Sequence, residues 1–156
     1  LIHSNKLKVG IRWSGNPRYE LELARTIDIR FFEEFLNRND IQLYSLQKND
    51  GDRNFKIPVN AIDLSGELNN WDDTMAAIKS LDLVISSCTS IAHVSGALGQ
   101  RTWVVVPLLP YYTWTDMKKE SCWYDTVTVY RQKQHGDWTD PFLEINSDIS
   151  KLLGDL

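Results

Sequence analysis

Several ligand-binding motifs are missing from this chain of 156 residues. No G-x-G-x-x-G and no G-x-x-x-x-G-K-[ST] pattern occurs, so neither a dinucleotide fingerprint nor a P-loop for nucleoside triphosphates is expected. The lack of a G-x-S-x-G elbow weakens the option of an α/β-hydrolase. Histidine, cysteine and carboxylate residues do not occur at metal-ligand spacings, and we therefore expect no metal site.

Positive charge, cysteine and long apolar runs are also scarce. The formal net charge is −4, which disfavours nucleic-acid binding because an acidic excess repels the phosphate backbone. The two cysteines, Cys88 and Cys122, lie far apart and favour reduced thiols in a cytoplasmic protein over a disulfide framework. No apolar segment approaches the roughly 20 residues that cross a bilayer, and the chain has no signal-like start.

What remains is the composition of an ordinary globular domain. Hydrophobic residues make up 42% of the chain, which predicts one domain over residues 1–156 with a buried core. The first residue is Leu1 rather than methionine, and we therefore expect the chain to be a segment of a longer or processed protein.

Predicted strands and helices alternate along the chain. Apolar alternation and short β-branched runs predict strands at 6–13, 41–46, 61–64, 83–85, 101–106 and 125–130. Apolar stripes at helical spacing predict helices that start at Asp28, at Asp72 or Asp73, near Ser90 and near Pro141. Residues 18–26 are expected to be a loop. This order is typical of an α/β protein, so we expect a three-layer α/β/α, Rossmann-like domain with a mostly parallel sheet of about six strands.

The stretch 83–99 is the strongest candidate for a binding site. It reads as a buried strand, a turn of small hydroxyl residues around Thr89 and Ser90, and a helix that Gly99 ends. A helix that starts at the carboxyl end of a buried strand presents unpaired N–H groups and a partial positive charge, which suit a phosphate. The alternative is an ordinary turn in which Thr89 or Ser90 only caps the helix.

Other residues near predicted strand ends could take part in such a site. His93 lies in the first turns of the same helix and could reach a diphosphate; the alternative is a core or solvated histidine. Ser14 and Gly15 follow the first strand, where small residues would let a phosphate approach, or they form a plain turn. Arg25 could pair with phosphate oxygens or be a solvated surface charge.

Aromatic residues and one cysteine offer two further options. Tyr111, Tyr112 and Trp114 could cover a sugar or a base, or pack as a hydrophobic lid. Cys88 at a helix start could be a nucleophile with a depressed pKa. Its nearest histidine, His93, lies five residues further on, and the two need not share a face of the helix.

Four segments resemble one known family: WSGNP at 13–17, YSLQK at 44–48, DLVISSCTSIAHVSGALG at 82–99 and RTWVVVPLLPYYTW at 101–114. Together they look like the carboxyl-terminal domain of GT-B glycosyltransferases. The closest resemblance is to the heptosyltransferase-type family and to its bacterial relatives fused behind tetratricopeptide repeats. It extends from about residue 8 to 153, and the pattern at 82–99 is its most specific part.

The resemblance implies a domain that binds the nucleotide-sugar donor of a metal-independent transferase, with no cofactor besides that substrate. The donor diphosphate would be bound by Ser14, Gly15, Arg25, Thr89, Ser90 and His93. The ribose would lie near Gln47, the base near Glu67 and Leu68, and the sugar near Cys88. The helix dipole, Arg25 and His93 would stabilise the charge that develops on the leaving diphosphate.

Two departures from the family leave other functions open. The family commonly has aspartate where this chain has Cys88, and the amino-terminal domain that binds the acceptor is missing from the chain. The isolated domain is therefore expected to catalyse little, since the cleft needs both walls. One alternative is a degenerate, non-catalytic domain that recognises a glycan or a protein; another is a thiol enzyme that uses Cys88.

Overall fold

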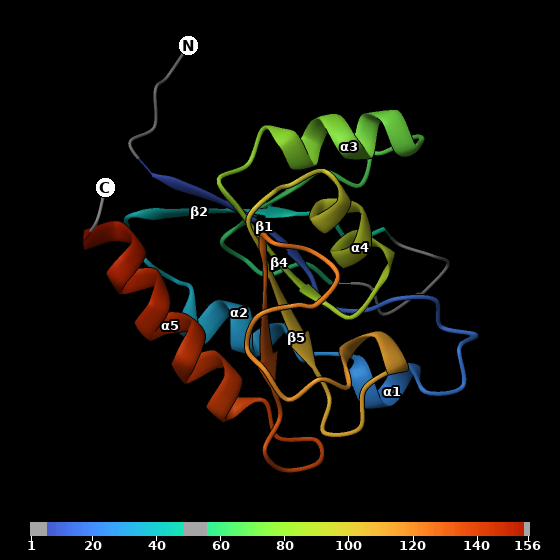
Figure 1. Ribbon diagram of the computed structural model, residues 1–156. Helices are drawn as coiled ribbons and strands as arrows, with labels where there is room; N and C mark the ends of the chain where they lie inside the picture. The colour runs from blue at the N-terminus through green and yellow to red at the C-terminus, as the bar shows by residue number, and fades with distance from the viewer. Residues whose placement is uncertain (1–5, 49–55, 155–156) are drawn as a thin grey trace.

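The computed structural model describes residues 6–48 and 56–154 (Figure 1). Its strands are β1 (Leu7–Arg12), β2 (Ile41–Ser45), β3 (Ala61–Asp63), β4 (Leu83–Ser87), β5 (Thr102–Val106) and β6 (Val127–Arg131). Its helices are α1 (Glu22–Arg25), α2 (Ile29–Phe35), α3 (Trp71–Lys79), α4 (Ser90–Ala97), the 3₁₀ turn η1 (Tyr112–Trp114) and α5 (Thr139–Gly154). Of the polar segment 47–58 that follows β2, residues 49–55 lie outside the described residues.

The described strands form one six-stranded sheet in the order β3-β2-β1-β4-β5-β6, and every neighbouring pair is parallel. Val9 of β1 pairs with Leu43 on one side and with Leu83 on the other. The chain therefore builds outward from β1 through β2 and β3, and then returns to add β4 on the opposite side. At such a reversal the two following segments diverge and leave a crevice at the carboxyl ends of β1 and β4.

Helices cover both faces of the sheet, which confirms the expected three layers. The helices α2 and α5 pack on one face, and α3 and α4 lie on the other (Figure 1). Strand β4 contributes to both cores, since Leu83 and Ile85 face the α2 and α5 side while Val84 faces α3 and α4. A strand covered on both faces needs apolar residues at consecutive positions, which explains the unbroken apolar run at 83–85.

Helix boundaries follow local capping groups. The Asp28 side chain accepts a hydrogen bond from the Arg30 N–H at 2.9 Å and so caps α2. The α3 helix starts at Trp71 rather than at Asp72 or Asp73, because the Asn70 side chain accepts the Asp73 N–H at 2.9 Å. Gly99, with φ of 66°, follows the end of α4 in the left-handed conformation expected of a terminating glycine.

The expectation that 18–26 is a loop throughout is wrong, because Glu22–Arg25 forms the short helix α1. A four-residue helix is too short to show an apolar period and too short to be stable alone, so tertiary contacts must hold it. None of the helices within 6–48 and 56–154 combines the length and the apolar character needed to cross a membrane.

Candidate functional site

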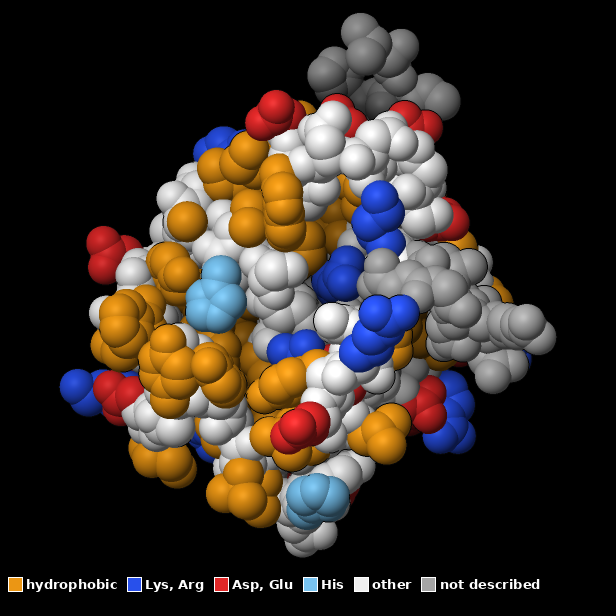
Figure 2. Space-filling view, turned by 90° about the vertical axis from the view of Figure 1, so that its right-hand side faces the viewer, with side chains coloured by type: hydrophobic (Ala, Val, Ile, Leu, Met, Phe, Trp, Pro, Cys, Tyr) orange, Lys and Arg blue, Asp and Glu red, His pale blue; other side chains and the backbone are white. Residues whose placement is uncertain are grey.

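A cavity of about 590 Å³ opens at the carboxyl ends of β1 and β4, where the topology predicts a crevice. Its lining consists of Arg12, Gly15, Asn16, Pro17, Arg18, Arg25, Thr89 and Ser90. Basic side chains gather near the centre of the face shown in Figure 2, with hydrophobic side chains beside them. Among the described lining residues three are arginines and none is acidic, so the cavity favours an anionic ligand.

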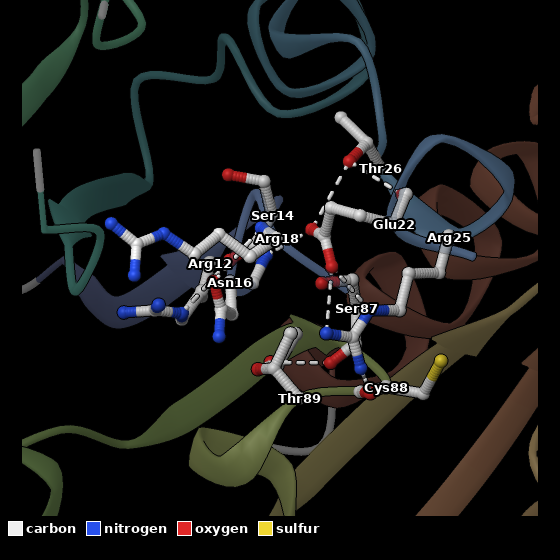
Figure 3. Close-up of polar contacts among 12 residues, drawn as sticks. Arg12, Ser14, Asn16, Arg18, Glu22, Arg25, Thr26, Ser87, Cys88 and Thr89 are labelled. Atoms are coloured by element: carbon white, nitrogen blue, oxygen red, sulfur yellow. Dashed lines mark hydrogen bonds and ion pairs between the residues drawn. The ribbon is translucent and has the colours of Figure 1, made fainter. Parts of the chain in front are cut away.

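Arg25 is held at this cavity by three partners, two of which, Glu22 and Cys88, are labelled in Figure 3. Its Nε donates to Glu22 Oε2 at 2.6 Å, and its Nη1 donates to the Cys88 carbonyl at 2.8 Å. The guanidinium also lies over the Tyr19 ring, 4.5 Å from its centroid. Because the Arg25 and Glu22 side chains are only 17% and 8% exposed, this ion pair is largely removed from water.

Gly15 lets the Arg25 guanidinium approach the backbone. A Cβ atom at Gly15 would collide with Nη2 of Arg25 and would lie 3.0 Å from Oε2 of Glu22. The Gly15 N–H donates to Oε1 of Glu22, so a protein carboxylate takes the group that the family resemblance assigns to the diphosphate. Gly15 still lines the cavity, and its clearest role is to make room for Arg25.

Arg12, the last residue of β1, was not singled out from the sequence. Its Nε donates to the Ser14 carbonyl at 3.0 Å and its Nη1 donates to the Leu46 carbonyl at 3.1 Å, which fixes the guanidinium. Its side chain lines the 590 Å³ cavity together with the exposed Arg18. The sequence signal available for Arg12 was a charged residue at the end of a predicted strand whose alternate positions are apolar. A buried arginine at such a position indicates a role, because arginines are rarely buried without a partner.

A second cavity, of about 340 Å³, adjoins the first. It is lined by Arg12, Leu46, Lys48, Leu68, Asn69, Asn70, Trp71, Thr74, Ser90 and Ile91. Arg12 and Ser90 line both cavities, so one elongated ligand can reach from the first into the second. Its mixture of apolar walls, amides and a lysine suits a flat polar ring better than a second phosphate.

The three residues expected near the ribose and base differ in where they lie. Leu68 lines the second cavity, whereas the neighbouring Glu67 is exposed and is not among its lining residues. Gln47 is 2% exposed, and its Oε1 accepts the Trp13 and Ser14 N–H groups at 3.3 and 3.1 Å. Gln47 therefore ties the ends of β1 and β2 together. It does not line the first two cavities but, like Ser14, lines a third one of about 760 Å³.

Thr89 and Ser90 bring the amino end of α4 to the first cavity. Thr89 occupies the N-cap position, but its side chain makes no capping hydrogen bond. Its hydroxyl instead lies 3.3 Å from Ser86 Oγ. The Thr89 side chain therefore does not cap α4. The partial positive charge at the amino end of α4 faces the arginine-lined cavity.

His93 is turned away from this cavity. Its Nδ1 lies 3.0 Å from the Tyr124 hydroxyl, and its ring packs against Trp114 at a centroid distance of 5.1 Å. Burial lowers the pKa of His93, so the neutral imidazole is favoured there. Trp114 is itself buried, whereas Tyr111 and Tyr112 are exposed and contact each other.

The Cys88 side chain also points away from the cavity, toward an apolar cluster. It packs with Ala92, Val104 and Trp114, and in Figure 3 its sulfur lies on the far side of the Arg25 guanidinium from Thr89. Burial raises the pKa of the Cys88 thiol to about 11. Only about one thiol in ten thousand is then ionised at pH 7, which disfavours a nucleophilic role.

Alkylation measures this difference directly. In the folded protein at pH 7.5, iodoacetamide should modify the exposed Cys122 and leave the buried Cys88 unmodified, as read by peptide mass spectrometry. A Cys122→Ser variant should be inert until it is denatured, which provides the control. Rapid labelling of Cys88 in the folded variant would restore the thiol-enzyme option.

Within the described ranges, no group of three or more histidine, cysteine and acidic residues could hold a metal ion. Comparisons of the chain with protein-family models, with curated proteins and with solved structures found no match. The two adjoining cavities and their cationic lining are therefore the features from which a function must be argued.

Proposed function

We propose that this domain binds the nucleotide-sugar donor of a metal-independent glycosyltransferase of the GT-B type. The family suggested by the sequence motifs is the heptosyltransferase-like group, including its bacterial members linked to tetratricopeptide repeats. The observation that carries the proposal is the convergence of Arg12, Arg18 and Arg25 on one cavity at the amino end of α4.

The charge of this cavity matches a diphosphate. Arginine donors pair with phosphate oxygens through short, charge-assisted hydrogen bonds, each worth about 1.5–3 kcal/mol. The helix end adds a partial positive charge, and the nearby Glu22 carboxylate, which lies outside the lining, is paired with Arg25. Since Arg12 and Arg25 are already fixed by protein carbonyls, little side-chain entropy is lost when a phosphate binds.

The adjoining cavity supplies a place for the nucleoside. The apolar side chains of Leu46, Leu68 and Ile91 can contact the faces of a base, and the amides of Asn69 and Asn70 lie at the same cavity. Because Arg12 lines both cavities, the part of a nucleoside diphosphate that joins the base to the phosphates would lie next to Arg12.

The same arrangement would aid departure of a nucleoside diphosphate. Charge that develops on the leaving phosphate would be stabilised by fixed arginines and by the α4 dipole, which need no reorganisation. The described lining of the diphosphate cavity contains no histidine or carboxylate to act as a base. We therefore infer that the base and the acceptor site come from a preceding domain or another chain. A cytoplasmic location belongs to the same proposal and fits the two free cysteines.

Calorimetric titration tests the proposal. The domain should bind at least one of ADP, UDP, GDP or their sugar conjugates, more weakly as salt rises. Arg18→Gln should weaken that binding at least tenfold, because one charge-assisted phosphate contact is lost. Arg30→Gln removes the same charge from an 80% exposed side chain outside the cavity lining and should have no effect. Absence of heat with every nucleotide would refute donor binding.

An exposed hydrophobic surface keeps a non-catalytic binding module as the second candidate. Leu109, Tyr111, Tyr112 and Met117, all in the connection between β5 and β6, are each more than half exposed. Exposed aromatic and aliphatic side chains of this kind can contact a glycan or a protein partner. Product formation by a longer protein that contains this domain would exclude the non-catalytic alternative.

A further inference from the structure

Glu22 pairs with Arg25 of the proposed phosphate cavity but is not among the residues that line it; Glu22 lines the 760 Å³ cavity instead. We propose that Glu22 is a positioning residue: it fixes Arg25 in the orientation that receives the ligand phosphate, and does not touch the ligand itself. This inference rests on the proposed binding of a nucleotide diphosphate in the 590 Å³ cavity.

Two of the three partners of the Glu22 carboxylate, Gly15 and Arg25, line that cavity. Its Oε1 accepts the Gly15 N–H and the Thr26 hydroxyl, the latter at 3.2 Å. Its Oε2 accepts Nε of Arg25 at 2.6 Å and forms the ion pair with Nη2 at 2.6 Å. The carboxylate thus connects a backbone N–H of the loop after β1 with the arginine that ends α1.

Glu22 also explains why α1 exists. The helix has four residues and no side-chain cap, so its own hydrogen bonds cannot hold it. The Thr26 hydroxyl donates to the Glu22 carbonyl at 2.8 Å, and the Glu22 carboxylate is anchored to Gly15. These contacts place Arg25 so that its Nη1 donates to the Cys88 carbonyl across the crevice.

A negative charge near an anion site has two opposite consequences. It repels the bound phosphate, and it holds a long, flexible cation in one orientation. Because the Arg25 guanidinium pairs with the carboxylate at 2.6 Å, its positive charge offsets much of this repulsion. We therefore expect the positioning effect to exceed the repulsion, so that removing the charge weakens binding.

The test compares two charge removals two residues apart. Glu22→Gln should weaken binding of pyrophosphate and of the best nucleoside diphosphate by at least tenfold in calorimetry. Glu20→Gln removes the same charge from an exposed side chain and should leave binding unchanged or slightly tighter. If Glu22→Gln binds as tightly as the wild type or more tightly, the positioning role is refuted.

An Arg25→Met background shows whether Glu22 acts through Arg25. There, Glu22→Gln should cause no further loss of the remaining affinity, whereas an equal loss in both backgrounds would refute the inference. In ¹⁵N-arginine-labelled protein, the Arg25 Nε–H signal should be protected from exchange before ligand is added, and Glu22→Gln should abolish that protection. An unprotected signal in the wild type would also contradict the role.

The two proposals fail in different ways. If the wild-type chain binds none of the phosphates, the proposed function fails; if it binds them and Glu22→Gln binds equally, only the role of Glu22 fails. Should Glu22→Gln not fold, Glu22→Asp takes its place, since it keeps the charge but withdraws the carboxylate from Nε of Arg25. A loss of about threefold supports the inference, and unchanged binding overturns it.

Discussion

Replacing Arg25 by methionine should lower the free energy of unfolding by about 3 kcal/mol and weaken binding of nucleoside diphosphates about thirtyfold, which leaves an affinity that calorimetry can still measure. The substitution leaves the Glu22 carboxylate 8% exposed and without its counter-ion. A charge stranded in this way is far more costly than a lost surface ion pair, which is typically worth less than about 1 kcal/mol. Urea unfolding followed by circular dichroism measures the stability change, and calorimetry measures the binding.

A double variant separates the stranded charge from the lost packing of Arg25. Adding Glu22→Gln to Arg25→Met removes the unpaired charge, and the amide oxygen can still accept the Gly15 N–H. Most of the lost stability should therefore return, although binding should not. If the two substitutions destabilise additively, the ion pair is not the source of the effect.

A methyl group at Gly15 should weaken nucleotide binding by about tenfold or more. In Gly15→Ala the new Cβ takes the space of the Arg25 guanidinium, which must move from its place between Glu22 and Cys88. Because the obstructing atoms belong to flexible side-chain ends, the stability cost should stay within about 1–3 kcal/mol. Calorimetry with the best nucleotide, alongside thermal melting, distinguishes these two effects.

Gly66→Ala is the matched control. A Cβ there meets nothing within 4 Å, so both binding and stability should match the wild type. Wild-type affinity in Gly15→Ala would mean that the position of Arg25 does not matter for the ligand. The proposed diphosphate site would then need a different set of donors.

The layered fold could be read from local patterns. The apolar run at 83–85, the hydroxyl turn and the terminating Gly99 predicted β4 and α4, and the structure confirms both. Asp28, as a residue type that caps helices, predicted the start of α2, and in the structure its side chain accepts the capping hydrogen bond from the Arg30 N–H. Such signals depend on residues within one or two turns of each other, so they can be recognised in the sequence without knowledge of the fold.

Directions of side chains near the crevice could not be read in the same way. The resemblance grouped His93 with Thr89 and Ser90, but the His93 ring packs on Trp114 and Tyr124 instead. These partners lie 21 and 31 residues further along the chain, beyond the reach of any local pattern. The predicted diphosphate role of His93 therefore has no support from the cavity lining.

The sequence by itself determined the parallel layered architecture, the strand-to-helix turn at 87–90 and the candidate edge of the sheet, because burial periods and helix caps are local properties. Only the tertiary structure decided that Arg12 and Arg25 meet at one cavity and that Glu22 takes the Gly15 N–H. It also decided that the Cys88 thiol turns into the core while its carbonyl binds Arg25, 63 residues away. Those outcomes depend on which strands become neighbours, and strand pairing brings distant residues together only once the whole sheet has formed.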